Sequence, residues 1–277
     1  MSLIHPLIDV KEFVENNSCK SRFITPISGD QGSSTTAFCS VSTPHDLPHR
    51  HLHTSCDEIS ILIRGEGVYG LGDQRISARV GDCRVVPKGA EHFFVNESGE
   101  PSLMVGFFVG AEDVAATGIA YGDPVTKDDL ATLRGEQDGG ILINLGDVQP
   151  ENMDQGDGWL ITDFRLPIST RNGCSSTLFR ARFMPGAVHK KHRHENCDEI
   201  YYIISGRGLA GAGSDRVEVR GGHFHFIPKG VEHWLHNLSD TEPIEVVGLY
   251  CGAGSVADTG YVYMGDVTPD DLKARTG

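Results

Sequence analysis

Long apolar segments and an excess of basic residues are both missing from this sequence. No apolar run approaches the roughly 20 residues that a membrane-spanning helix needs. The first residues, MSLIHPLIDVKEF, lack the basic start and apolar core of a signal peptide. The 24 lysines and arginines are outnumbered by 38 acidic residues, which gives a net charge of -14 and argues against nucleic acid or an anionic membrane as a partner. We therefore expect a soluble, cytoplasmic protein.

The residue patterns of several common sites are also missing. Seven cysteines are an odd number without framework spacing, so reduced thiols are expected instead of a disulfide scaffold. No phosphate-binding P-loop, no dinucleotide-binding G-x-G-x-x-G and no Ser-His-Asp nucleophile arrangement stands out. None of these patterns therefore assigns a function to the chain.

An internal repeat is the main feature that the sequence does have. Residues of the first half recur in the second half 141 positions later, and further along the offset becomes 142. The matched positions are His51, His53, Glu58, Gly65, Gly81, Pro87, Gly89, His92 and Asn96 in the first half, and His192, His194, Glu199, Gly206, Gly222, Pro228, Gly230, His233 and Asn237 in the second. The chain is therefore a tandem duplication in which one residue was inserted after the last matched position.

The spacing of the histidines within each half is typical of a metal site. His192 and His194 are two residues apart, so on a β-strand both imidazoles face the same way. Glu199 has the wrong parity for one straight strand, which predicts that a turn over residues 195–198 brings it back across a hairpin. His233 then arrives from another strand. The equivalent set in the first half is His51, His53, Glu58 and His92.

At these residues the sequence resembles the cupin family. The two family motifs, G-x5-H-x-H-x3,4-E-x6-G and G-x5-P-x-G-x2-H-x3-N, fit the stretch from Gly186 to Asn237 without a departure. The resemblance implies a small antiparallel jelly-roll barrel that holds one divalent metal through three histidines and a carboxylate. Because the first half repeats the nine matched motif residues from His51 to Asn96, the whole chain resembles the two-domain bicupins.

We therefore predict an all-β protein of two tandem cupin barrels with short C-terminal helices. The N-terminal barrel should span 1–135 and the C-terminal barrel 141–277, joined by a polar, Gly-rich linker. The helices should begin near Thr126 and Thr268, where a threonine precedes acidic residues. Residues 10–14 can form either a helical turn or an edge strand. Strands of the first barrel are expected at 35–41, 58–63, 67–71, 83–86, 92–96 and 102–109.

The ligand type limits the metal chemistry. Three neutral imidazoles and one carboxylate suit a divalent Fe, Mn, Ni, Zn, Co or Cu ion, and we expect up to two ions per chain. Four protein ligands on a six-coordinate metal leave two positions for a substrate, or for a substrate plus O2. The resemblance implies a dioxygenase-type oxidoreductase acting on a small anionic or enolic/aromatic substrate. Two alternatives stay open: a non-redox decarboxylase, isomerase or lyase, and a cupin that binds metal and small molecules without catalysis.

Differences between the halves indicate which site is catalytic. Tyr201 shares a strand face with Glu199, whereas the first half has Ser60 at that position. We therefore interpret Tyr201 as a catalytic residue that hydrogen-bonds a metal-bound ligand, although a half-buried strand aromatic would look the same. His189 is the second catalytic candidate, because it leads into the metal site and its counterpart is Pro48.

Basic residues near the second ligand set suggest attraction for an anionic substrate. A solvated loop and an outward strand face would give the same pattern. Edge strands left by the duplication lead us to expect a homodimer. The basic cluster comprises Arg180, Arg182, His189, Lys190, Lys191, His223 and His225.

Overall fold

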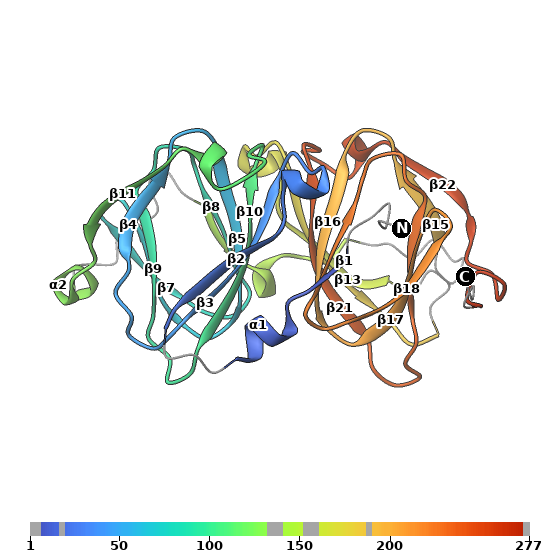
Figure 1. Cartoon of the computed structure of the whole chain (residues 1–277), viewed down its shortest axis with the longest axis horizontal. Coiled ribbons are helices and arrows are strands. Elements are labelled where there is room, and N and C mark those ends of the chain that lie inside the picture. Colours follow the sequence, from blue (N-terminus) through green and yellow to red (C-terminus); the bar gives the residue numbers. More distant parts are fainter. Residues whose placement is uncertain (1–6, 17–19, 132–140, 152–160, 187–189, 274–277) are drawn as a thin grey trace. The chain divides into compact units, whose positions relative to one another are not determined.

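The computed structural model describes residues 7–16, 20–131, 141–151, 161–186 and 190–273. The chain divides into two compact units (Figure 1). We call Phe13–Asp147 the first barrel, and Met1–Glu12 together with Val148–Gly277 the second barrel. The predicted all-β architecture is confirmed, because strands dominate both units.

Two antiparallel sheets form the first barrel. One sheet is six-stranded with the order β12-β8-β5-β10-β3-β2, and the other is five-stranded with the order β11-β4-β9-β6-β7. The strands are β2 (Arg22–Ile27), β3 (Thr36–Ser42), β4 (His49–His53), β5 (Asp57–Arg64), β6 (Gly67–Leu71), β7 (Gln74–Ala78), β8 (Asp82–Val86), β9 (His92–Asn96), β10 (Ser102–Val109), β11 (Ile119–Pro124) and β12 (Ile141–Asn144).

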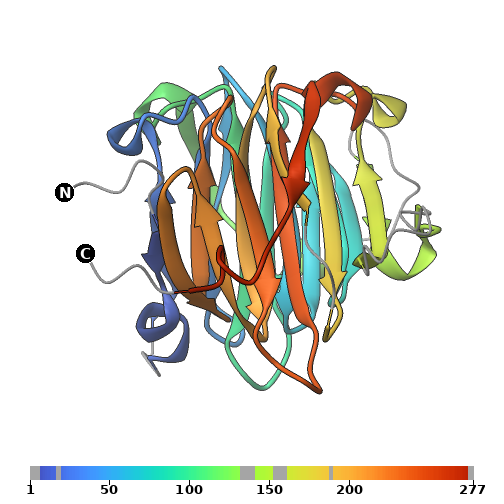
Figure 2. The same ribbon diagram turned by 90° about the vertical axis from the view of Figure 1, so that its right-hand side faces the viewer.

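The second barrel repeats this plan. Its sheets have the orders β1-β19-β16-β21-β14-β13 and β18-β17-β20-β15-β22, and apart from the blue β1 its strands run from yellow to red in Figure 2. The strands are β1 (Leu7–Asp9), β13 (Ile161–Ile168), β14 (Thr177–Phe183), β15 (Lys190–His194), β16 (Asp198–Ser205), β17 (Arg207–Ala212), β18 (Asp215–Arg220), β19 (His223–Ile227), β20 (His233–Asn237), β21 (Ile244–Cys251) and β22 (Tyr261–Asp266).

The six strands predicted for the first barrel are confirmed as β3, β5, β6, β8, β9 and β10. The helix predicted near Thr126 is confirmed as α2 (Lys127–Ala131), and the stretch left open near the N-terminus is α1 (Lys11–Glu15). Short 3-10 helices lie at Gly29–Gln31, Ala115–Thr117, Leu145–Asp147, Thr170–Asn172 and Ala257–Thr259. No helix in the described ranges is long and apolar enough to cross a membrane.

The prediction of a helix after Thr268 is wrong for the described residues. Residues 269–272 form turns in the described part of the chain, although Thr268 and Asp271 make the predicted capping contacts. The Leu272 amide donates to the Thr268 carbonyl at 3.3 Å. One hydrogen bond of this α-helical type closes a turn, whereas a helix needs a series of them.

The structure divides the chain differently from the predicted boundaries of 1–135 and 141–277. Strand β1 pairs with β19 of the second barrel, and Ile8 lies opposite Phe224. Strand β12 pairs with β8 of the first barrel, and Ile143 lies opposite Cys83. Each of these short strands supplies partners to an edge that would otherwise expose backbone donors and acceptors. The segment preceding each half therefore completes a sheet of the other half, and the predicted linker at 135–140 lies outside the described residues.

In each barrel, one glycine allows an aromatic ring to lie against the sheet. A Cβ atom on Gly106 would lie 2.2 Å from Cζ of Phe38, and one on Gly248 would lie 2.5 Å from Cζ of Phe179. Any side chain at either position would displace the ring. Both rings line the cavities described below, so the glycines help to shape the sites.

Candidate metal centres

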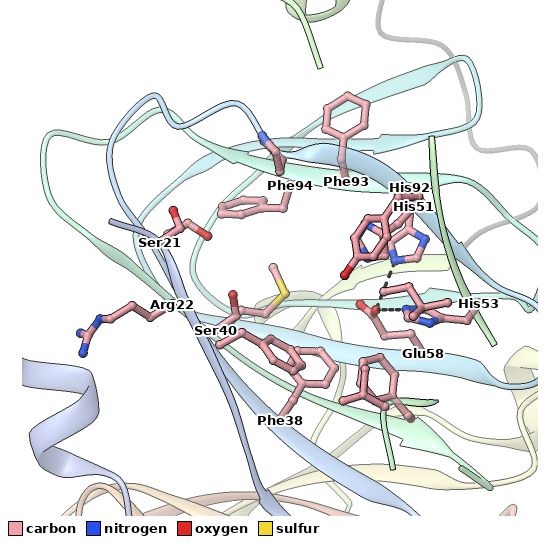
Figure 3. Close-up of a pocket in the computed structure, with 18 of the residues that line it drawn as sticks. Ser21, Arg22, Phe38, Ser40, His51, His53, Glu58, His92, Phe93 and Phe94 are labelled. Carbon is pink, nitrogen blue, oxygen red and sulfur yellow. Dashed lines mark hydrogen bonds and ion pairs between the residues drawn. The ribbon is translucent and has the colours of Figure 1, made fainter. Parts of the chain in front are cut away.

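The structure brings together all four predicted ligands in the first barrel. His51 and His53 extend from β4, Glu58 from β5 and His92 from β9, and one ligand atom of each lies within 4.8 Å of the others. His51 is directly opposite His92 in the register of β4 and β9. Figure 3 shows the histidines grouped around the Glu58 carboxylate.

The second barrel has the same arrangement. His192, His194, Glu199 and His233 also offer ligand atoms within 4.8 Å of one another, and His192 lies opposite His233. The predicted hairpin is wrong in one respect, because β15 and β16 belong to different sheets. The turn before Glu199 carries the chain from one sheet of the barrel to the other. Glu199 therefore faces the histidines across the barrel interior.

Hydrogen bonds fix how the histidines present their ring nitrogens. Nδ1 of His92 donates to the Ala90 carbonyl at 3.0 Å, and Nδ1 of His233 donates to the Val231 carbonyl at 2.9 Å. A carbonyl can only accept, so the Nδ1 atoms carry protons and the neutral rings keep a lone pair on Nε2. Nε2 of each ring lies 3.2 Å from a carboxylate oxygen, Oε2 of Glu58 or of Glu199. Two lone pairs facing each other at this distance call for a cation between them.

The remaining buried histidines point to the same requirement. Nδ1 of His53 and of His194 is buried without a hydrogen-bond partner, and Nε2 of each ring faces the glutamate Oε2 atom, at 3.5 Å and 3.2 Å, without forming a hydrogen bond. Such unpartnered nitrogens are costly in a protein interior unless a ligand satisfies them. The residues therefore fit a bound divalent metal, and the donor set of three imidazoles and one carboxylate does not choose among transition metals.

Burial and neighbouring charges shift the pKa values of several ligands toward the protonation state that binds a metal. Burial, together with the charges of His92 and His53, lowers the pKa of His51 to about 4, and similar causes lower the pKa of His192 well below its usual value. Burial alone would raise the pKa of Glu58, but neighbouring His92 and His53 reverse this effect and hold it well below its usual range. The imidazoles of His51 and His192 are therefore neutral near pH 7 and the Glu58 carboxylate is charged, as metal coordination requires.

Each ligand set opens into a cavity of the size that small-molecule sites have. The cavity of the first barrel measures about 410 Å³ and that of the second about 480 Å³. Both have aromatic walls, formed by Phe38, Phe94 and Phe108 in the first barrel, and by Phe164, Phe179 and Tyr250 in the second. Each metal set therefore faces a space that can accept a small organic molecule.

The Glu58 carboxylate has a partner that the sequence analysis missed. Nη2 of Arg84 donates to Oε1 of Glu58 at 2.9 Å, and both side chains are buried. At the equivalent position the second barrel has His225. A signal was present in the sequence, because Ser60 and Arg84 are replaced together by Tyr201 and His225. These residues lie opposite each other on neighbouring strands in both barrels.

Tyr201 lies where the sequence analysis placed it, on the strand face that carries Glu199, and it lines the second cavity. Its hydroxyl shares a hydrogen bond of 2.5 Å with Nδ1 of His225, and both side chains are buried. Burial and the charge of Glu199 raise the pKa of Tyr201 well above its usual value, so the phenol stays protonated. The other catalytic candidate, His189, lies outside the described residues.

The basic cluster predicted near the second metal set does not face the cavity in the described part of the chain. Arg180 pairs with Asp163 and Glu245, and Lys191 pairs with Asp271 at 3.0 Å. These pairs leave Glu199 as the one Asp, Glu, Lys or Arg side chain among the described residues that line the second cavity. The described members of the cluster therefore do not support attraction of an anionic substrate, and two of them, His223 and His225, are buried instead of solvated.

Comparison with known proteins identifies the family. The model of the family described as "Cupin domain" matches residues 40–109 and 179–250, which together make up more than half of the sequence. The chain belongs to the cupin family. Each matched segment includes two histidines, the glutamate and the third histidine of one metal set, so this cupin has two complete candidate metal centres.

Relatives of this cupin have varied descriptions. An oxalate-binding protein of Thermotoga maritima is 26% identical over 106 residues, which cover 37% of this chain and 88% of the relative. An uncharacterized protein of Methanocaldococcus jannaschii is 30% identical over 91 residues, covering 33% of this chain and 71% of the relative.

Two solved structures show a similar fold. A mutant of Bacillus subtilis oxalate decarboxylase matches with a TM-score of 0.65 and 14% identity, over 95% of this chain and 79% of the other. The coconut allergen cocosin matches with a TM-score of 0.65 and 12% identity, over 84% of this chain and 81% of the other. At these identities the similarity concerns the fold alone.

Proposed function

We propose that this bicupin is a metal-dependent enzyme of the dioxygenase type, and that its principal catalytic site is in the second barrel. The observation that carries the proposal is the combination of a complete ligand set, an aromatic cavity and the Tyr201–His225 pair in one place. In the first barrel, Ser60 replaces the tyrosine and Arg84 replaces the histidine.

The lining of the second cavity suits a planar and largely apolar substrate. Phe164, Phe179 and Tyr250 give it aromatic walls, and Phe179 stacks on Tyr250 with ring centroids 4.6 Å apart. The buried Glu199 carboxylate disfavours a dianion that lacks a compensating charge. An enol, a phenol or a diketone would present one or two oxygen atoms to the ligand set and bury the rest of its surface against the rings.

His192, His194, Glu199 and His233 would hold the metal, which supplies a binding position for substrate oxygen and for O2 when bound. The aromatic walls orient the substrate and exclude water. Tyr201 holds a proton on its hydroxyl, and His225 can donate from Nδ1 to that oxygen, which turns the phenolic proton toward the cavity. Tyr201 then donates a hydrogen bond to the substrate oxygen where negative charge develops.

Reconstitution under reducing conditions provides the direct test. The metal-free protein is loaded separately with Fe(II), Mn(II), Co(II), Ni(II), Cu(II) and Zn(II), and O2 uptake is measured against a panel of enols, catechols and diketones. We expect O2 consumption with a redox-active metal and none with Zn(II). Turnover without O2 consumption would establish the non-redox decarboxylase, isomerase or lyase instead. Metal-saturated protein that binds members of the panel without converting any of them would leave a binding function.

We also propose that the protein is a cytoplasmic homodimer. Among the described residues, outer strands such as β7 and β18 pair with a neighbouring strand on one side only, so their other edge is available to a second copy. Analytical ultracentrifugation over a range of concentrations should show a dimer, and a concentration-independent monomer would rule it out.

A further inference from the structure

The two cavities differ in the charged side chains that line them. In the described residues, the first cavity is lined by Arg22, Asp46, Glu58 and Arg84, which sum to zero charge. The corresponding sum in the second cavity is one negative charge, from Glu199. The histidines cancel in this comparison because each cavity has three. With the same divalent metal bound, the first cavity is therefore more positive by one elementary charge.

Arg84 is responsible for this difference at the metal centre. Its Nη2 atom donates to Oε1 of Glu58, while Oε2 of the same carboxylate faces His92 at 3.2 Å. Arg84 therefore neutralises the ligand carboxylate from the side opposite the histidines. The side chain is buried and lines the cavity, so water does not screen its charge strongly.

The guanidinium of Arg84 also keeps unused donor capacity. Nε is buried without a hydrogen-bond partner, and the contact from Nη1 to the Phe93 carbonyl is long, at 3.4 Å. The hydroxyls of Ser60 and Tyr69 are two further buried polar groups without partners. Ser60 lies opposite Arg84 in the strand register, and Arg84 lies over the Tyr69 ring with its Cζ 4.3 Å from the centroid. Buried donors of this kind are normally satisfied, so the site calls for an acceptor.

The other two charged residues of this cavity, Arg22 and Asp46, have partners of their own. Arg22 donates to the carbonyls of Phe13 and Asn16, and Figure 3 shows its guanidinium directed away from the histidines. Asp46 accepts from the Ser21 hydroxyl. Arg22 is therefore a cation of the same cavity whose guanidinium is already hydrogen-bonded to other groups. This makes Arg22 a matched control for Arg84.

We propose that Arg84 makes the first barrel a binding site for a small monoanion, such as a carboxylate. The anion would lie in the cavity that Arg84 and the metal ligands share, where the buried cation compensates its charge. The second barrel disfavours the same ligand, because Glu199 has no arginine at the place of Arg84. This assignment requires a metal in the first barrel, but it does not depend on any reaction in the second.

Two single-site proteins test the assignment. His192→Ala with His194→Ala leaves the first centre, and His51→Ala with His53→Ala leaves the second. Each is loaded with Co(II), its metal content and circular dichroism are checked, and azide and then formate are titrated while the visible absorption of the cobalt is recorded. We expect both anions to bind the first centre at least tenfold more tightly than the second. Equal affinities, or tighter binding at the second centre, would overturn the proposal.

Substitutions of the arginine identify its part in the binding. In the protein that keeps the first centre, Arg84→Gln should weaken azide binding at least tenfold, whereas Arg84→Lys should retain the affinity within about threefold. Arg22→Gln should weaken the affinity by no more than about threefold, because Arg22 is hydrogen-bonded to the carbonyls of Phe13 and Asn16, away from the metal set. Undiminished binding to Arg84→Gln would refute the assignment, as would an equal loss in Arg22→Gln. If Arg84→Gln does not fold, the proposal is tested by Arg84→Lys and by the comparison of the two centres. A large loss of affinity in Arg84→Lys would also contradict the proposal.

Discussion

The two barrels have the same metal ligands and different neighbours around them. Glu58 is held by Arg84, whereas in the second barrel Tyr201 and His225 bond to each other beside Glu199. Identical ligand sets therefore do not imply identical sites, because the charge and the proton donors next to them differ. After the duplication, the two centres could separate in function without losing a ligand.

A tyrosine is present in both barrel interiors, but on different strands. Tyr69 on β6 has Ala210 as its counterpart, and Tyr201 on β16 has Ser60. Both tyrosines are buried. Exchanging a large and a small residue between two buried positions of a barrel keeps the packed volume similar, which cores tolerate well. The exchange also moves the phenol: Tyr201 lines its cavity, whereas Tyr69 lies under Arg84.

The largest expected difference between the barrels concerns turnover. His192→Ala with His194→Ala should abolish activity, by more than about 100-fold, because it removes two ligands of the proposed catalytic centre. His51→Ala with His53→Ala should retain most of the activity. Metal analysis should show the loss of one equivalent in each protein. Similar activity losses in two folded proteins would show that both centres contribute to catalysis.

A second difference should be visible in stability. Arg84→Gln leaves the buried Glu58 carboxylate without its cation, and breaking a buried pair in this way costs about 3 kcal/mol. We expect this loss in the metal-free protein, measured as the free energy of unfolding in urea. Saturation with Zn(II) should recover part of it, because the metal compensates Glu58. The matched change in the second barrel, His225→Gln, breaks no ion pair with Glu199 and should cost less; an equal cost would contradict this account.

The sequence predicted the ligands well, because their spacing is a local property. His51 and His53 share one strand face, and the repeat at His192 and His194 confirms the pattern independently. The contact between Arg84 and Glu58 joins two residues that are 26 positions apart in sequence, so no local pattern reveals it. Only the paired replacement of Ser60 and Arg84 in the second half hinted at it.

Domain boundaries could not be predicted for a similar reason. The Gly-rich stretch 135–140 looks like a linker, and its composition is that of one, but the strand that follows it pairs backward with β8. Edge pairing depends on which sheet has an open edge, and that is known only once both barrels are assembled. The wrong helix prediction after Thr268 has a different cause. The capping residues are in place, but the helix does not continue beyond the first turn.

Removal of the hydroxyl should have different effects on activity at Tyr201 and at Tyr69. Tyr201→Phe should lower turnover by about tenfold with little change in metal content, because the proposed hydrogen bond to the substrate oxygen is lost. Tyr69→Phe is the matched control: its hydroxyl is buried without a hydrogen-bond partner, so its loss should leave activity unchanged and stability equal or slightly higher. Steady-state kinetics and metal analysis of both variants provide the measurement, and equal kinetics for Tyr201→Phe and the wild-type protein would remove Tyr201 from the mechanism.

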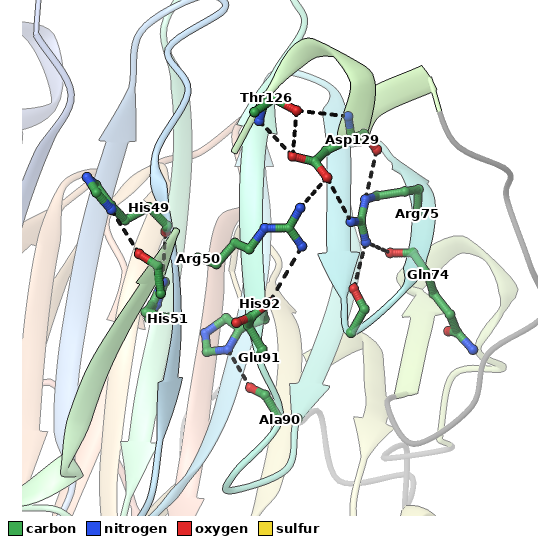
Figure 4. A network of polar contacts seen from close by, with 12 residues as sticks. His49, Arg50, His51, Gln74, Arg75, Ala90, Glu91, His92, Thr126 and Asp129 are labelled. Carbon is green, nitrogen blue, oxygen red and sulfur yellow. Dashed lines mark hydrogen bonds and ion pairs between the residues drawn. The ribbon is translucent and has the colours of Figure 1, made fainter. Parts of the chain in front are cut away.

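The smallest expected effects on stability concern an aspartate near the C-terminal end of each barrel, Asp129 or Asp271. We call this aspartate and its basic partners the carboxylate clamp. In the first barrel, Asp129 accepts from the Thr126 amide at 2.7 Å and from Arg50, while Arg75 donates to its carbonyl at 2.9 Å (Figure 4). In the second barrel, Asp271 pairs with Lys191 at 3.0 Å, and Arg216 donates to its carbonyl at 3.0 Å. The clamp ties the C-terminal segment of each barrel to the strand that carries two of the metal histidines.

Asp129→Asn and Asp271→Asn keep the side-chain shape and remove the charge. The hydrogen bond from the Thr126 amide and the contact with Arg50 lower the pKa of Asp129 from 3.8 to about 2. A carboxylate whose pKa is depressed by folding adds stability above its unfolded pKa and loses it as the pH falls. At pH 7 each variant should lose about 0.5 to 1 kcal/mol, as partly exposed ion pairs do. The gap between Asp129→Asn and the unsubstituted protein should narrow from about pH 4 to about pH 2 in urea unfolding of the metal-free forms. Curves that stay parallel over that interval would mean that the clamp acts through its shape and not its charge.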